Sequence, residues 1–138
     1  MVSERALHPV LTPERRRELI EEGINLFNRG EYFAAHEAWE EVWRSTTPEP
    51  RDLFQGLVQL AAAFHHLHAR KRPDVARRVL GKARDRLACV VGVGEGFDIA
   101  ALLAELEQWD EWLTLAAAIP PPRPWLRRSA PADRSSEN

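Results

Sequence analysis

The sequence is poor in residues that form disulfides or react with oxidants. It has one cysteine, Cys89, and one methionine in 138 residues. A single cysteine excludes an internal disulfide and is typical of proteins in a reducing cytosol. We therefore expect a cytoplasmic protein. All but two of the 19 basic residues are arginine. A thermophilic source is one interpretation of this composition, and a GC-rich genome is another.

The chain also lacks a long apolar run and a strong net charge. No uncharged apolar stretch reaches the roughly 18 residues that cross a bilayer, and the longest, residues 53–69, contains glutamine and histidine. Charged residues are spread through the first thirty positions, so we expect no signal peptide. The net charge of −2 excludes bulk attraction to a polyanion. We therefore predict no membrane partner, and a nucleic-acid partner would need a local basic patch.

What the sequence does contain is helical periodicity. Its length fits one domain, and apolar residues recur at helical spacing in five segments. The first starts at Thr12, a good N-cap followed by Pro13, and the fifth starts at Asp98. The second runs over about 32–45, the third over about 51–70, and the fourth starts at Pro73. We predict an all-α bundle over residues 12–118, with the second and third helices as its core antiparallel hairpin. An N-terminal extension, 1–11, precedes it, and a Pro-rich, partly disordered tail, 119–138, follows.

Polar side chains interrupt the two helices of the expected core hairpin. His36 and Glu40 fall at the edge of the apolar arc of the second helix, and Gln55, Gln59 and His66 form a narrow stripe on the third. An unsatisfied buried polar group costs about 1–3 kcal/mol. The set is therefore expected to be hydrogen-bonded to itself or bound to something else.

Three interpretations of this polar set remain open. One is a metal site formed by His36, Glu40 and His66, with Glu37 as an additional candidate, because imidazole and carboxylate groups bind Zn, Mn or Fe in helical bundles. The set is alternatively a site for a small polar ligand, or a structural network that fixes the register of the two helices. The candidate ligand-binding residues are His36, Glu37, Glu40, Trp43, Gln55, Gln59 and His66.

The fourth predicted helix is rich in basic residues. Arg77, Arg78, Lys82 and Arg84 lie mostly on its solvent side and are positioned to meet phosphates. No aromatic residue interleaves them for base stacking, so a solvated face is the simpler interpretation. An interaction module for protein or nucleic acid, with a purely structural polar set, is therefore the alternative function.

One run of residues carries a resemblance to a known family. The sequence Ala-His36-Glu37-Ala-Trp39-Glu40-Glu-Val-Trp43, followed by Gln55, Gln59 and His66, resembles the domain of unknown function 309 family of small prokaryotic and plastid proteins. The similarity extends over about 12–113, and its Ala-His-Glu-x-Trp-Glu-x-x-Trp signature is specific. The resemblance implies an all-α bundle and gives weight to a site at the signature residues, but it implies no activity.

Overall fold

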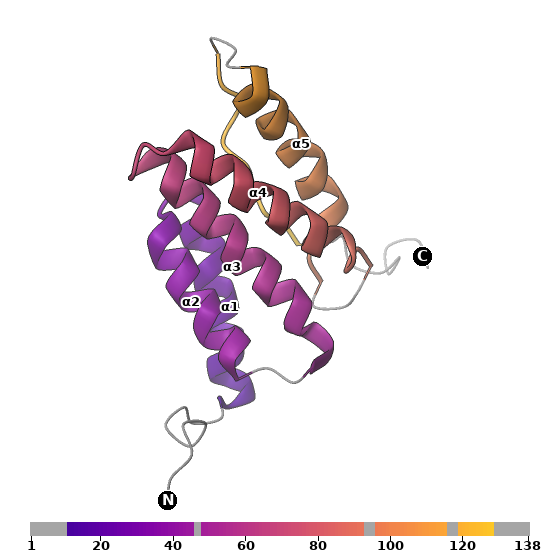
Figure 1. Ribbon diagram of the computed structural model, residues 1–138. Coiled ribbons are helices and arrows are strands. Elements are labelled where there is room, and N and C mark those ends of the chain that lie inside the picture. The colour runs from indigo at the N-terminus through magenta and orange to yellow at the C-terminus, as the bar shows by residue number, and fades with distance from the viewer. Residues whose placement is uncertain (1–10, 46–47, 93–95, 116–118, 129–138) are drawn as a thin grey trace, which may run out of the picture.

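The computed structural model describes residues 11–45, 48–92, 96–115 and 119–128, and of residues 48–50 it describes only the backbone. Consecutive helices pack on one another, so α3 lies between α2 and α4 (Figure 1). This confirms the predicted all-α bundle, and none of the described helices is long and apolar enough to cross a bilayer. The five helices are α1 (Pro13–Asn28), α2 (Tyr32–Arg44), α3 (Pro48–His68), α4 (Pro73–Ala88) and α5 (Ile99–Leu115).

Two ring contacts show that α2 and α3 form an antiparallel hairpin. Near the connecting turn, the Arg51 guanidinium carbon lies 5.1 Å from the centre of the Trp43 ring. At the other end of the hairpin, the rings of Phe33 and His65 are 5.2 Å apart. The predicted pairing of these two helices is therefore confirmed.

Local capping chemistry explains where several helices begin. The Thr12 hydroxyl accepts a hydrogen bond of 3.0 Å from the Arg15 N–H, and the Asp98 carboxylate accepts one of 3.1 Å from the Ala101 N–H. Both caps satisfy backbone donors that have no partner within the helix. One boundary differs from the prediction. The helix α3 begins at Pro48, ahead of the expected start near 51, because the locked φ of proline suits the first helical turn.

Trp39 is the centre of the contact between α1 and α2. Its ring is fully buried, lies 5.7 Å from the Phe27 ring, and its indole N–H donates to the Ile20 carbonyl at 3.4 Å. Gly23 of α1 lies directly against this ring, because a Cβ there would be 2.1 Å from Trp39 Nε1. Only glycine permits this approach of the two helices.

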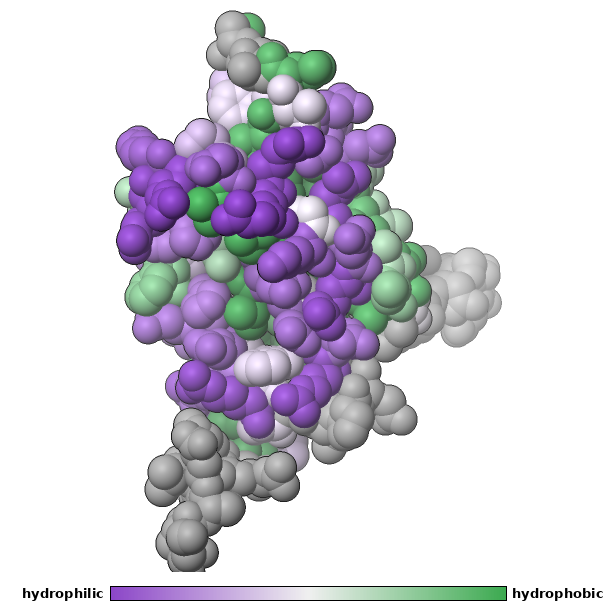
Figure 2. Space-filling model, viewed as in Figure 1, coloured by the Kyte–Doolittle hydropathy of each residue, from purple (hydrophilic) through white to green (hydrophobic). Residues whose placement is uncertain are grey.

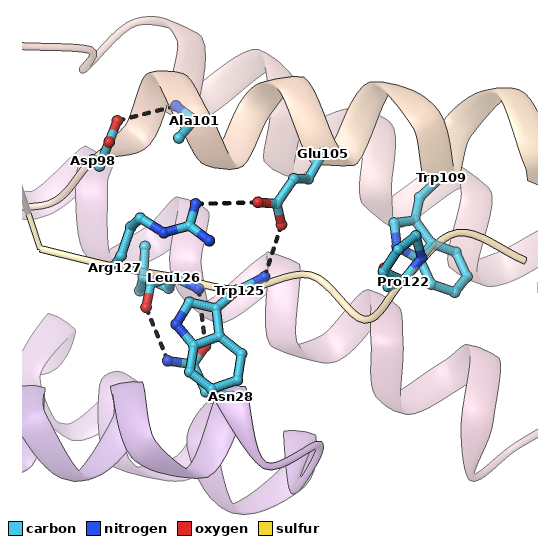
Figure 3. A network of polar contacts seen from close by, with 9 residues as sticks. All are labelled: Asn28, Asp98, Ala101, Glu105, Trp109, Pro122, Trp125, Leu126 and Arg127. Carbon is cyan, nitrogen blue, oxygen red and sulfur yellow. Dashed lines mark hydrogen bonds and ion pairs between the residues drawn. The ribbon is translucent and has the colours of Figure 1, made fainter.

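Residues 119–128, which we call the strap, run along α1 and α5 in an extended conformation (Figures 1 and 3). The Asn28 amide holds the strap through two hydrogen bonds of 2.9 Å, one to the Leu126 carbonyl and one from the Leu126 N–H. Leu126 is fully buried. The Trp109 indole N–H donates to the Pro122 carbonyl at 3.0 Å. The described part of the predicted tail is therefore docked on the helices; residues 129–138 lie outside the described residues.

The close contact at Gly23 yields a stability prediction. Substitution Gly23→Ala should lower the free energy of unfolding by about 1–3 kcal/mol, because the buried Trp39 ring has no room to move away from the added methyl group. Gly81→Ala is the matched control: a Cβ there meets no atom within 4 Å, so it should gain about 0.5–1 kcal/mol from helix propensity. Urea denaturation measures both. Equal effects at the two positions would contradict the account.

Candidate functional site

The polar stripe of α3 lies on the side of the helix opposite its buried residues. By the 100° rule, Gln55, Gln59 and His66 project away from the buried apolar face, and all three are half-exposed. Helix α3 packs on α2 and α4 and leaves this side towards solvent. The residues of its fully or almost fully buried face are Leu53, Phe54, Leu57, Leu60, Ala61, Ala63 and Phe64.

The candidate residues of α2 also lie at the surface edge of the bundle. His36, Glu40 and Trp43 are half-exposed, and Glu37 is exposed. Figure 2 views the molecule from the side on which α2, α3 and α4 lie, and hydrophilic side chains cover most of this surface. No polar or charged residue among those described is buried as a whole. The set is thus accessible to a ligand rather than sealed inside the hairpin.

The structure brings only some of the candidate side chains together. His36 Nδ1 lies 4.0 Å from a Glu40 carboxylate oxygen, beyond hydrogen-bonding distance. The other oxygen of Glu40 pairs with Arg44 at 3.3 Å. No hydrogen bond links α2 to Gln55, Gln59 or His66 within the described ranges. The network that would fix the helix register is therefore not formed by these side chains.

Several candidate side chains carry a buried atom with no hydrogen-bond partner. The unpartnered atoms are His36 Nδ1, Trp43 Nε1, Gln59 Oε1 and His66 Nδ1, which make four of the seven such side-chain atoms in the described part of the chain. Leaving each one unpaired costs about 1–3 kcal/mol. Their concentration in a set chosen from the sequence calls for a functional explanation.

A histidine cluster that sequence reasoning missed adjoins His36. The exposed Phe33 ring stacks on His36, with ring centres 6.1 Å apart, and the His65 and His66 rings are 6.2 Å apart. Burial lowers the pKa of His65, and the neighbouring positive charges of His66, Arg70 and His36 lower it further. Nothing in the sequence pattern singles out His65, because it lies off the polar stripe.

The groove between α3 and α4 joins the polar stripe to the basic helix. We call it the Gln59–Arg86 groove; its volume is 380 Å³. Arg86 Nε is buried without a hydrogen-bond partner, while Arg86 Nη1 pairs with Asp52 at 3.1 Å. Two of the residues that line this groove, Gln59 and Arg86, therefore each carry a buried polar atom without a partner. The groove is lined by Asp52, Gln59, Lys82, Asp85, Arg86 and Cys89.

Sequence reasoning treated the polar stripe and the basic run as separate features. The spacing of Lys82 and Arg86 on one face of the fourth helix is the signal that could have joined Arg86 to the candidates. Of the predicted basic patch, Arg77, Arg78 and Lys82 are exposed, whereas the half-exposed Arg84 pairs with Asp110 of α5 at 3.4 Å. The patch is thus smaller than the sequence indicates.

The predicted metal set is not assembled as a metal site. In the ranges that the structure describes, no three histidine, cysteine, aspartate or glutamate side chains are grouped so that they could hold an ion. Protein zinc sites need at least three such ligands. His36 and Glu40 approach each other as a pair only, and His66 does not complete the set.

This geometry predicts the response to metal ions. Addition of Zn²⁺, Mn²⁺ or Fe²⁺ to chelator-treated protein should leave the melting temperature unchanged, because His36, Glu40 and His66 do not form a three-ligand site. Differential scanning fluorimetry measures the effect. A metal-dependent rise in melting temperature that His36→Ala removes would contradict this account.

Comparison with known proteins identifies a family model that matches part of the chain. No curated protein and no solved structure matches the chain. Residues 20–79 match the model of a family described as "Domain of unknown function (DUF309)". This segment contains all of α2 and α3, and with them the whole Ala-His-Glu-x-Trp-Glu-x-x-Trp signature. Residues 20–79 thus carry the similarity of this chain to the domain of unknown function 309 family.

Proposed function

We propose that the protein is a binding domain for a small polar ligand, which is held in the Gln59–Arg86 groove. The observation that carries the proposal is the pair of unpartnered buried atoms, Gln59 Oε1 and Arg86 Nε, in one groove. A ligand that donates to the first and accepts from the second would repay the cost of burying both. The volume of 380 Å³ falls within the range of small-molecule pockets, about 300–1,000 Å³.

The charges that line the groove define the class of ligand. Lys82 and Arg86 are positive, and Asp52 and Asp85 are negative. The ion pair of Arg86 with Asp52 uses Nη1, while Nε of the same guanidinium is buried and has no hydrogen-bond partner. A molecule with an anionic group and a cationic hydrogen-bond donor complements both signs of charge. An amino acid is the simplest such molecule.

The signature residues beyond the groove would extend the site. Gln55 and His66 share the outer side of α3 with Gln59, one turn before it and two turns after it. A ligand longer than a free amino acid would therefore reach the half-exposed His66 side chain. The proposal includes binding only, because no described nucleophile forms a hydrogen-bonded pair with a general base here.

We also propose that the protein acts in the cytoplasm. Cys89 is a free and exposed thiol, which suits a reducing compartment. A thermophilic source rests on composition alone and stays a prediction.

The binding proposal is tested by thermal shift with a panel of the standard amino acids. At a concentration of 100 times Kd, a bound ligand should stabilise the fold by about 2.7 kcal/mol. Isothermal titration calorimetry of the most stabilising member would then give its stoichiometry. If no member of the panel raises the melting temperature or gives heat on titration, the amino-acid proposal fails.

Substitution of Gln59 separates binding from stability. Gln59→Leu should leave the free energy of unfolding unchanged or raise it by about 1 kcal/mol, because it removes an unpaired buried acceptor. The same variant should lose ligand binding. Gln108→Leu is the matched control on exposed α5 surface and should change neither property much. A Gln59→Leu variant that loses stability yet binds normally would show a structural role for Gln59.

A further inference from the structure

We infer that the protein has a second ligand site, the strap pocket, which binds a flat organic anion and which the strap completes. The strap pocket has a volume of 380 Å³ and shares no residue with the Gln59–Arg86 groove. The pocket is lined by Tyr32 of α2, His68 of α3, Trp109 of α5, Arg29 directly after α1, and Pro121 and Arg123 of the strap. The residues thus come from three helices, the connection after α1, and the strap.

Aromatic rings form the walls of the strap pocket. The Tyr32 and His68 rings stack with their centres 5.7 Å apart and their planes at 18°. Trp109 meets His68 edge to face, at 6.1 Å and 88°. The Trp109 indole N–H already donates to the Pro122 carbonyl, so this residue offers its ring rather than a hydrogen bond. Such walls favour a flat, apolar ring in the ligand.

Cationic and donor groups surround these walls. Arg29 pairs with Glu31 at 3.0 Å, whereas Arg123 makes one long hydrogen bond, of 3.4 Å to the Asn28 carbonyl, among the residues that the structure describes. The arginines of the pocket therefore carry more positive charge than Glu31 balances. An anionic group on the ligand would pair with Arg123 through its planar guanidinium.

Tyr32 adds an unused polar atom to this region. The residue is 5% exposed, and its hydroxyl has no hydrogen-bond partner among the described residues. Burial raises the pKa of Tyr32 to about 12, and the charge of Arg123 opposes this rise. Burial also lowers the pKa of His68, as do Lys71 and Arg123. Near neutral pH the walls are therefore uncharged, and the arginines supply the charge that attracts an anion.

The strap makes binding dependent on its own docking. Pro120, Pro121 and Arg123 line the pocket, and further contacts hold the strap beyond them. Asn28 grips the Leu126 backbone through two hydrogen bonds, and Glu105 accepts a hydrogen bond of 2.9 Å from the Trp125 N–H (Figure 3). A ligand that contacts both the strap and the helices stabilises the docked strap. By linkage, release of the strap lowers the affinity for the ligand by the same free energy.

The probes are benzoate and phenyl phosphate, with benzamide as the neutral control. Titration calorimetry should show binding of at least one anion and roughly tenfold weaker binding of benzamide. Arg123→Gln should lower the affinity for the anion about tenfold or more. Arg17→Gln, at an exposed position of α1, should leave that affinity unchanged. Absence of binding by both anions, or equal binding by wild type and Arg123→Gln, overturns the proposal.

The role of the strap has a separate test. Hydrogen exchange of the Leu126 N–H in the wild-type protein should slow when benzoate or phenyl phosphate is bound. Asn28 does not line the pocket. Asn28→Ala should nevertheless lower the affinity for the anion and speed the exchange of the Leu126 N–H, while circular dichroism shows unchanged helix content. If exchange does not respond to the anion, or if Asn28→Ala binds as tightly as wild type, the strap does not complete the site. Neither result depends on whether the Gln59–Arg86 groove binds an amino-acid ligand.

Discussion

The packing of α3 between its two sequence neighbours determines the layout of the molecule. Its buried face, represented by Leu57, Leu60 and Phe64, supplies the central apolar contact, while α2 and α4 flank it (Figure 1). A helix in this position keeps one side towards solvent. That side carries Gln55, Gln59 and His66, and the groove with α4 opens beside it. The most characteristic polar residues of the chain are therefore available to a ligand.

The family signature combines two kinds of residue. Trp39 is a core residue, fully buried between α1 and the centre of the bundle, and it requires glycine at Gly23. His36 and Trp43 are half-exposed, and each has a buried ring nitrogen without a partner. In this chain the signature thus combines packing positions with positions that carry unpaired hydrogen-bonding groups. The second kind is the better guide to function.

The sequence predicts local features of this protein well. Caps at Thr12 and Asp98 mark helix starts because the chemistry of a helix N-terminus involves only neighbouring residues. Helical phase correctly groups the buried residues of α2, such as Trp39 and Val42. The family resemblance is likewise confirmed over residues 20–79.

Long-range pairings could not be predicted in the same way. Helical phase says which residues share a face but not which neighbour that face meets, so the stripe of α3 could not be placed relative to α2 or α4. Gln59 and Arg86 meet only through the packing of two helices. Asn28 and Leu126 are 98 positions apart, and an amide that grips a backbone has no periodic signal. The groove and the strap therefore emerge only from the tertiary structure.

The most direct test of the proposed function is a crystal structure of the protein soaked with a saturating amino acid. The account predicts electron density for the amino acid in the Gln59–Arg86 groove, with hydrogen bonds to Gln59 Oε1 and Arg86 Nε, the two atoms that lack partners. It is contradicted if the groove holds no amino acid and those two atoms are paired with other protein groups.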